Sequence, residues 1–496
     1  MKTIARINPE KEYENAKNIV ELASTQKLDL EHVTSLDSSI TNLMTATRVL
    51  MEREDRRKGK KKIPKETLKK GRKEGEERKE VKKLPSERYP DIEVCEDVIY
   101  PAKAPKCPCC NSTMKDSGLF DVTEKLEVIP KRYFIQRNVR PKFNCGKCHG
   151  AIVNTLALPS IIPSSNYGDS LIIDATLSKF CDLIPLERYA QMAARNGLEN
   201  LPPQSLIGLT HGLAAFMMVV YLKLKDEVQS SKVLLADETP QKMLEGDETK
   251  NWYLWGFFSQ SASYFEAHPT RSGDVPLEFI RSSSATHLLT DGYSGYHKAI
   301  RLLKEEDKRK VIEVYCNSHA IRYFKDASTT WAQECEPFLD IYGDIYDLEK
   351  QRKKRNLSPK KQLDLREKMI PLFKRLKYLC EESQEGAMAG SGLEKAINYF
   401  LNHYDGLTVC TTNIDIPLDN NHSEREMRPP VVGRKTWYGT HSKRGVETTV
   451  VHFSIIASCR INGINPRNYY PWVVERIHEG LPPLTPYEYS QIKGTQ

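Results

Sequence analysis

The chain has 496 residues, of which 39% are hydrophobic, and its formal net charge is +8. This length exceeds what one ordinary hydrophobic core organises, so two to four domains are expected. The sequence has no run of about 18 apolar residues and its first residues lead straight into charged ones, so neither a membrane span nor a secretory signal is expected. A cytosolic location follows, and the twelve cysteines are expected to be thiols or metal ligands rather than disulfides.

The basic excess lies in one segment. Between Arg53 and Lys83 there are 16 Lys and Arg against 7 Asp and Glu, so the rest of the chain is close to neutral. Few apolar residues interrupt the charges, which predicts a flexible linker that serves either as a phosphate-binding arm or as a tether. Ahead of it, residues 38–57 have apolar positions at helical spacing and predict an amphipathic helix. That helix either pairs with a partner helix or packs within a small helical unit.

Two cysteine pairs predict a zinc site. Each has Cys-x2-Cys spacing, which lets two knuckles place four thiolates tetrahedrally around the ion. Because four thiolates leave no position for water, the zinc is structural. The ligands are Cys107, Cys110, Cys145 and Cys148, with Cys109 as the alternative to Cys110. Strands are predicted between the pairs at residues 126–130 and 133–139. A basic surface either contacts DNA or belongs to a scaffold, and it consists of Arg132, Arg137, Arg140 and Lys142.

Helical spacing returns between Ser170 and Leu224, and these helices are expected to pack against the segment that follows. That segment predicts five strands, at residues 232–237, 251–258, 263–267, 287–291 and 310–316, with helices before the fourth and fifth. The predicted order is three strands, a helix, a strand, a helix and a strand, which is the order of a ribonuclease-H-like sheet. In that sheet the first and fourth strands are neighbours.

Two of these strands end in an aspartate. Asp237 follows four apolar residues and precedes a turn signal at Thr239-Pro240, and Asp291 follows a second apolar run and precedes a glycine. Neighbouring strands would bring the two carboxylates together as a shared metal site. The alternative is that each aspartate only caps a turn.

Several ordered motifs, together with the upstream cysteine pairs, resemble transposases of the insertion-sequence-66 family from about Cys107 onward. They are Ala236-Asp237-Glu238-Thr239-Pro240, Thr290-Asp291-Gly292-Tyr293-Ser294-Gly295-Tyr296, Asp419-Asn420-Asn421-His422-Ser423-Glu424-Arg425, Arg428-Pro429 and Gly433-Arg434-Lys435. The resemblance implies a DDE transposase with the triad Asp237, Asp291 and Glu424. Such carboxylates bind two Mg²⁺ ions, for which Mn²⁺ can substitute, about 3.5 to 4 Å apart. No further cofactor is implied beyond the structural Zn²⁺.

Glu424 has competing interpretations. Asn421-x-x-Glu424 also fits a helix capping box, in which the glutamate bonds back to the cap. Glu426 is the competing carboxylate for the third position of the triad. Glu238 is expected to point away from Asp237 and to play a supporting role at most.

The chain departs from the family pattern in two places. Leu235 stands where a histidine is expected, and Asn317-Ser318-His319-Ala320-Ile321-Arg322 stands where Trp-Ala-His-Xaa-Arg-Arg is expected. His319 and Arg322 remain as candidate DNA contacts, although His319 also fits an ordinary surface histidine. Further cations are expected to follow the DNA phosphates beside the active site, namely Arg425, Arg428, Arg434 and Lys435.

Between the fifth strand and Glu424, apolar spacing predicts an insertion of antiparallel helices, whose Lys350–Arg355 run is either solvated or faces DNA. Helices are also predicted from about Glu447 to Ile461 and from Pro466 to Ile477. The predicted fold is α+β and multidomain. Its parts are an N-terminal helical segment (1–57), a basic linker (58–95), a zinc module (96–160), a helical domain (161–228), a ribonuclease-H-like core (229–320 and 413–445), a helical insertion (321–412) and C-terminal helices (446–496).

The resemblance implies strand cleavage at transposon ends and joining of the 3′-hydroxyls to target DNA. The partners implied are double-stranded DNA, further copies of the chain on that DNA and accessory proteins of the same element, with no membrane and a location at the nucleoid. A second hypothesis is a noncatalytic DNA-binding protein derived from a transposase. A third is a nuclease with the same triad that makes no joined product.

Overall fold

The computed structural model describes residues 84–98, 105–106, 109, 111–114, 122–144, 152–244, 251–354 and 357–493. The chain divides into two compact units, one of residues 61–136 and one of residues 1–60 with 137–496. The predicted helix at 38–57, the basic segment Arg53–Lys83 and the four predicted zinc ligands lie outside the described residues.

The described part of the smaller unit has little regular structure. It contains α3 (Pro85–Arg88) and a bridge between Lys106 and Thr113. Ser86 ties α3 to Glu124, since its backbone N–H and its hydroxyl each donate to that carboxylate at 2.8 Å.

The strands predicted at 126–130 and 133–139 are wrong, because the described residues 122–141 contain no strand. Ile129 and Ile135 are more than nine-tenths exposed. An apolar run forms a strand when a second strand beside it pairs with its backbone N–H and C=O groups. The described residues supply no such second strand here. A short antiparallel pair follows instead, made by β1 (Lys142–Asn144) and β2 (Ile152–Asn154).

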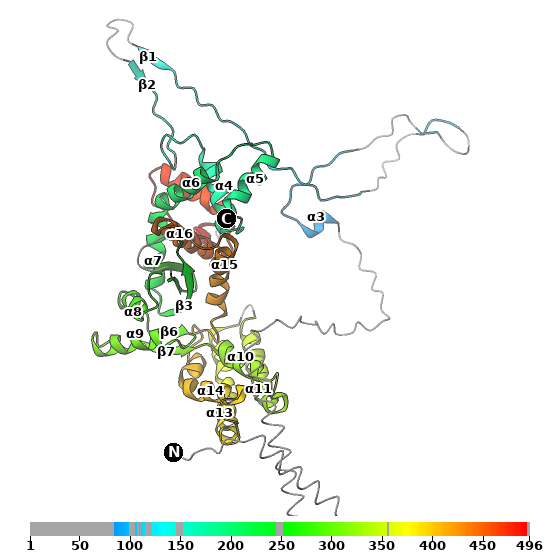
Figure 1. Ribbon diagram of the computed structural model, residues 1–496. Helices are drawn as coiled ribbons and strands as arrows, with labels where there is room; N and C mark the ends of the chain where they lie inside the picture. Colours follow the sequence, from blue (N-terminus) through cyan, green and yellow to red (C-terminus); the bar gives the residue numbers. More distant parts are fainter. Residues whose placement is uncertain are drawn as a thin grey trace, which may run out of the picture. The chain divides into compact units, whose positions relative to one another are not determined.

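A five-stranded mixed sheet forms the centre of the larger unit (Figure 1). Its strands are β3 (Val233–Lys242), β4 (Asn251–Phe258), β5 (Ser263–His268), β6 (His287–Thr290) and β7 (Ile312–Tyr315), in the order β5-β4-β3-β6-β7. β3, β4 and β5 are antiparallel, whereas β6 and β7 run parallel to β3. The prediction that the first and fourth strands are neighbours is confirmed by the β3–β6 ladder.

Helices occupy the segments in which the sequence predicts them. Those before the fifth strand are α4 (Asp169–Phe180), α5 (Leu186–Arg195), α6 (Pro203–Phe216), α7 (Met218–Gln229), α8 (Asp274–Arg281) and α9 (Ser294–Glu305). Among the described helices, none alone is both long and apolar enough to cross a membrane, and the bent pair α6 and α7 meets that test only when taken together.

The C-terminal helices are α15 (Asn421–Trp437), α16 (Lys443–Ile461), α17 (Pro466–His478) and α18 (Pro486–Lys493). α16 is buried along most of its length, and its polar side chains are satisfied within the core. The Ser458 and Ser454 hydroxyls each accept a hydrogen bond at 2.9 Å from backbone N–H groups of β5, those of Ser263 and Phe265. Because β5 is an edge strand, α16 covers backbone donors that would otherwise lack partners.

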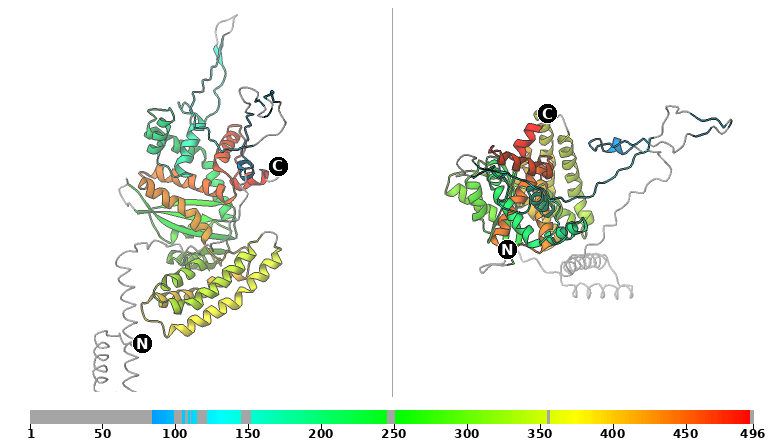
Figure 2. Two further views of the ribbon diagram at one scale, coloured as in Figure 1. Left: turned by 90° about the vertical axis from the view of Figure 1, so that its right-hand side faces the viewer. Right: turned by 90° about the horizontal axis from the view of Figure 1, so that it is seen from above.

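Five helices fill the segment predicted as a helical insertion. They are α10 (Asn317–Ala327), α11 (Ala332–Arg352), α12 (Pro359–Glu367), α13 (Met369–Gln384) and α14 (Gly392–Thr408). The long helices coloured yellow in Figure 2 lie side by side. Their interior is aromatic and aliphatic, with Phe324 of α10 stacked on Phe338 of α11 at 4.7 Å between ring centroids. Apolar burial at helical spacing therefore accounts for this bundle.

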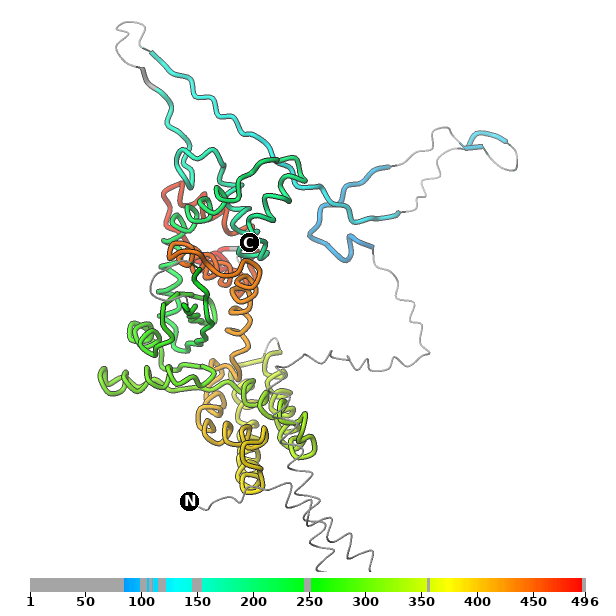
Figure 3. The backbone as a smooth tube through the Cα atoms, viewed as in Figure 1, coloured from blue at the N-terminus to red at the C-terminus, as the bar shows by residue number. Residues whose placement is uncertain are grey.

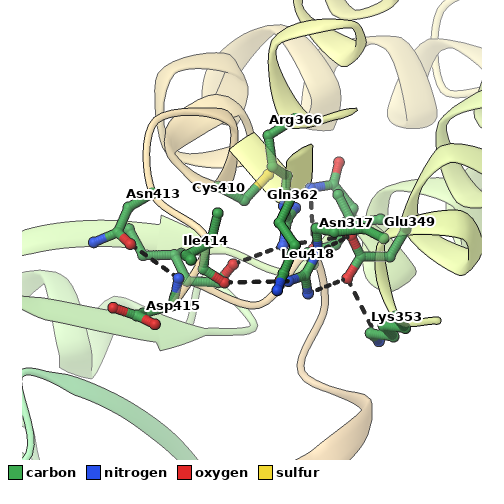
Figure 4. A network of polar contacts seen from close by, with 12 residues as sticks. Asn317, Glu349, Lys353, Gln362, Arg366, Cys410, Asn413, Ile414, Asp415 and Leu418 are labelled. Carbon is green, nitrogen blue, oxygen red and sulfur yellow. Dashed lines mark hydrogen bonds and ion pairs between the residues drawn. The ribbon is translucent and has the colours of Figure 1, made fainter. Parts of the chain in front are cut away.

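A buried ion cluster ties the bundle to the segment that returns to α15 (Figure 4). Glu349 of α11 binds Arg352 through two hydrogen bonds of 2.9 Å and lies 3.4 Å from Arg366 of α12, whose side chain is 0% exposed. Arg366 in turn donates to the carbonyl of Ile416 at 2.9 Å. Burial raises the pKa of Glu349, but its hydrogen bonds to Arg352 and the charge of Arg366 outweigh this and hold the pKa below its usual value.

Replacement of Glu349 by alanine is expected to destabilise the protein by about 3–5 kcal/mol, because it leaves the buried Arg366 without its counter-charge. Thermal or urea unfolding measures the effect. The matched control is Glu306→Ala, which removes an exposed glutamate from its pair with Arg281 and is expected to change stability little. Equal losses in the two variants would contradict a stabilising role for the cluster.

Candidate active site

Asp237 lies inside β3 rather than at its end. The turn predicted at Thr239-Pro240 is wrong, because β3 continues to Lys242. Pairing with β6 stops at Leu235, whereas pairing with β4 runs on to Lys242. Asp237 therefore lies just beyond the point at which β3 loses one of its two neighbours, and proline is compatible with a strand that has a single neighbour.

Gly256 pairs with Asp237 across the β3–β4 ladder. A Cβ atom at this glycine would lie 2.5 Å from the Phe258 ring and 2.9 Å from the sulfur of Met427 on α15. A side chain would therefore push α15 away from the strand. The motifs miss Gly256, and the signal that could have found it is a glycine inside an aromatic strand, which marks a close approach of another element.

Asp291 directly follows β6 and is held in a tight turn. Its Oδ1 accepts a hydrogen bond from the backbone N–H of Tyr293 at 3.0 Å, and Gly292 between them has φ +91°. Glycine adopts this conformation without steric cost. The Tyr399 hydroxyl of α14 donates to the Asp291 carbonyl at 3.2 Å. The helical bundle thus helps to position the second aspartate.

Glu424 lies in the first turn of α15 and faces α10. The N-cap residue is Asn420 and makes no side-chain cap bond, so the capping box considered as the alternative for Glu424 does not form. Arg322 Nη2 lies 3.3 and 3.4 Å from the two carboxylate oxygens of Glu424, and His319 Nε2 lies 3.8 Å from Oε1. Arg322, which the sequence offers as a DNA contact, therefore holds Glu424, whereas His319 lies beside it without a hydrogen bond. Figure 3 traces the backbone from the bundle into the orange helix that carries Glu424.

The three acids interact electrostatically. Burial and the negative charges of Glu238, Asp291 and Glu424 together raise the pKa of Asp237 to about 8, against one opposing backbone hydrogen bond. A carboxyl group with this pKa keeps its proton at neutral pH unless a cation takes the proton's place. Asp291 and Glu424, which are far from Asp237 in the sequence, thus lie close enough for their charges to act on it.

Glu238 has its own partners, which the motifs also miss. Arg271 Nη2 lies 2.6 Å from Glu238 Oε1, and the Tyr296 hydroxyl donates to Oε2 at 2.6 Å. Burial raises the pKa of Glu238, although these two hydrogen bonds oppose the increase. Glu238 therefore contributes charge beside Asp237 while its oxygens are occupied by protein groups.

Glu426 is paired elsewhere in the structure. Its side chain is buried, and its Oε2 accepts hydrogen bonds from Arg460 of α16, the shorter at 2.7 Å. This ion pair joins α15 to α16. Glu426 is therefore a neutralised core carboxylate, whereas Glu424 is half-buried and faces α10.

The predicted cations of α15 have two environments. Arg425, Arg428 and Lys435 are exposed, and their spacing places them on neighbouring parts of one helix surface. Arg434 is partly buried, and its Nη1 donates to the Thr239 hydroxyl of β3 at 3.3 Å. Burial lowers the pKa of Arg434. The exposed cations can meet an anionic polymer, while Arg434 links α15 to the strand of Asp237.

Comparison with known proteins gives consistent matches along the chain. Uncharacterized protein y4jD of Sinorhizobium fredii is 26% identical over 396 residues, which cover 77% of each chain. Uncharacterized protein y4hP of the same bacterium is 26% identical over 429 residues, covering 81% of this chain and 76% of the relative. Residues 105–149 match the zinc-finger binding domain of transposase IS66 and contain both cysteine pairs. Residues 164–448, which contain Asp237, Asp291 and Glu424, match the transposase IS66 family, and the chain therefore belongs to that family.

Proposed function

We propose that this protein is a DDE transposase that cleaves DNA at transposon ends and joins the freed 3′-hydroxyls to target DNA. Its catalytic acids would be Asp237, Asp291 and Glu424. The observation that carries the proposal is the β3–β6 register, in which Leu235 pairs with Leu289 and Asp237 and Asp291 each follow two residues later. The raised pKa of Asp237, caused by burial and by the nearby acidic charges, agrees with it. Membership of a transposase family supports DNA processing as the general activity.

A ribonuclease-H-like core is part of the proposal. Its support is the sheet order β5-β4-β3-β6-β7, with three antiparallel strands followed by two parallel ones. Asp237 lies in β3 and Asp291 directly follows the neighbouring strand β6, while Glu424 comes from a helix that packs on β3 and β4. Such a core would hold the carboxylates on rigid elements, as precise catalysis requires.

The carboxylates suit Mg²⁺, with Mn²⁺ as a substitute, because hard divalent cations prefer carboxylate oxygens. The raised pKa of Asp237 supports this assignment, since a cation would offset both the burial and the nearby negative charges that raise it. When bound, two such ions activate the attacking oxygen and stabilise the leaving oxygen of a phosphodiester.

The neighbouring groups of the chain would position acids and DNA. Arg322 orients Glu424, while Arg425, Arg428 and Lys435 would follow the phosphate backbone. Cys107, Cys110, Cys145 and Cys148 would hold a structural Zn²⁺ in the zinc-finger domain. We further propose that the protein works at the nucleoid as a multimer on DNA, with accessory proteins of the same element.

A noncatalytic DNA-binding protein is the alternative. It would need the basic surfaces and the zinc module, but not several carboxylates whose charges raise the pKa of Asp237. Such repulsion lowers the stability of the folded state. Carboxyl groups with strongly shifted pKa values cluster at functional sites, where this cost is offset by function. The arrangement at Asp237 therefore favours the enzyme.

Alanine in place of Asp237, Asp291 or Glu424 is expected to lower Mg²⁺-dependent strand cleavage and joining at least about 1000-fold, since metal-held charge stabilisation is worth several kcal/mol. The assay incubates the protein with DNA carrying transposon ends and separates the cleaved and joined products. The control is Glu381→Ala, which changes an exposed glutamate of α13. Wild-type activity in Asp237→Ala would refute the triad, and cleavage without joined product would identify a nuclease.

Asp237 also predicts a pH-dependent stability. Its pKa is raised from 3.8 to about 8, so the folded state favours the protonated form, and the associated stability is lost as pH rises through this interval. Asp237→Asn is neutral at every pH and is expected to raise the Tm more near pH 8 than near about pH 5. Mg²⁺ is expected to raise the Tm of wild type near pH 8 but not that of the variant. A Tm difference independent of pH, with no effect of Mg²⁺, would contradict both expectations.

The exposed cations of α15 predict a salt effect. Arg425→Ala and Arg428→Ala are each expected to weaken binding to DNA of any sequence and to reduce the slope of log affinity against log salt by about 1. Binding titrations at several salt concentrations measure the slope. Arg301→Ala, on the exposed surface of α9, serves as the control. An unchanged slope would remove α15 from the phosphate contacts.

A further inference from the structure

A cluster of three different ligand types lies at the junction of α10 and α15. Cys316, His319 and Glu424 each offer one atom, and these sulfur, nitrogen and oxygen atoms all lie within 4.8 Å of one another. Cys316 is the N-cap residue of α10, and His319 follows it by one helical turn. Glu424 comes from the first turn of α15. Two helix starts, more than 100 residues apart in sequence, therefore converge here.

The Cys316 sulfur is buried and accepts a hydrogen bond from a backbone N–H group. Its side chain is 0% exposed, and the backbone N–H of Asn420 donates to Sγ at 3.1 Å. Burial raises the pKa of this thiol to about 12, while backbone N–H groups of Asn420, His319 and Ser318 act in the opposite direction. Without a cation the thiol stays protonated, and a bound metal ion would take the place of that proton.

His319 lacks the hydrogen bonds expected of a partly buried imidazole. Within the described residues, its Nδ1 atom is buried and has no hydrogen-bond partner. Its Nε2 atom lies 3.8 Å from Glu424 Oε1, which is too long for a hydrogen bond. A buried polar atom without a partner is rare and often indicates a missing ion or water. The imidazole is thus available as a metal ligand.

We propose that Cys316, His319 and Glu424 form a binding site for a borderline transition-metal ion, Zn²⁺, which is separate from the four-cysteine module. Thiolate, imidazole and carboxylate are the ligand types of zinc, whereas Mg²⁺ prefers oxygen alone. With bonds of about 2.0 to 2.3 Å, ligand atoms around a tetrahedral ion are separated by roughly 3.3 to 3.8 Å. The observed separations reach such a geometry through side-chain adjustments of about 1 Å.

Three protein ligands leave the fourth position of the ion open to water or a phosphate oxygen. Arg322 remains within reach of Glu424, because it lies close to both carboxylate oxygens while the ion would need one. If Glu424 is also a catalytic acid, which rests on the proposed function, Zn²⁺ would compete with Mg²⁺ for it. Occupancy by zinc would then inhibit strand cleavage.

The test is a metal count on the full-length protein. Wild type is incubated with excess Zn²⁺, passed through a gel-filtration column and analysed by inductively coupled plasma mass spectrometry. Cys316→Ser and His319→Ala are each expected to retain one zinc fewer per chain than wild type. Their affinity for this zinc is expected to fall more than about 100-fold, because even loss of an outer-shell partner costs 10–100-fold. Cys380→Ser, which changes a buried cysteine of α13, is the matched control and is expected to retain the wild-type count.

Equal zinc content in wild type, Cys316→Ser and His319→Ala would overturn the proposal, as would an equal loss in Cys380→Ser. Circular dichroism checks that the variants are folded, and the half-exposed His319 provides a test if Cys316→Ser does not fold. The count uses no DNA and no Mg²⁺. Its failure would therefore leave the proposed transposition chemistry untouched, and loss of strand cleavage in Asp237→Ala would not bear on the zinc site.

Discussion

The combination of burial and nearby negative charge at Asp237 is the constraint on which the rest of the site depends. Asp237 is only partly exposed and feels the charges of Glu238, Asp291 and Glu424, so its carboxyl group resists ionisation and its pKa is raised to about 8. Only a rigid framework can hold such groups together, because each would otherwise move into water. The sheet, the helical bundle and α15 supply that framework. The same repulsion gives the site its affinity for cations in the proposed function.

The bundle of α10–α14 contributes to the site at several points, although it supplies none of the three acids. Tyr399 binds the carbonyl of Asp291, and Arg322 holds Glu424. The cluster around Glu349 and Arg366 fixes the segment that leads to α15. A helical insertion between the fifth strand and the third acid thus acts as a support for catalytic geometry in the proposed enzyme.

Glu424, at the start of α15, would serve both of the proposed metal sites. With Asp237 and Asp291, Glu424 would be one of several oxygen ligands. With His319 and Cys316, it would join a nitrogen ligand and a sulfur ligand. Hard and borderline cations would therefore meet at one carboxylate. This arrangement links the proposed zinc site to the proposed catalytic site through a single shared residue.

Strand and helix positions in the larger unit follow from the sequence, because hydrophobic period and capping are local properties of the chain. The helix start at Asn465-Pro466 is one example, since the Asn465 side chain does cap α17. The sequence also determined the family through motifs around Asp237, Asp291 and Glu424. The local sequence pattern does not predict the structure where contact with another segment of the chain decides it. Residues 126–130 have strand character but no described strand neighbour, and Asp237 lies inside a strand because β4 continues beyond β6.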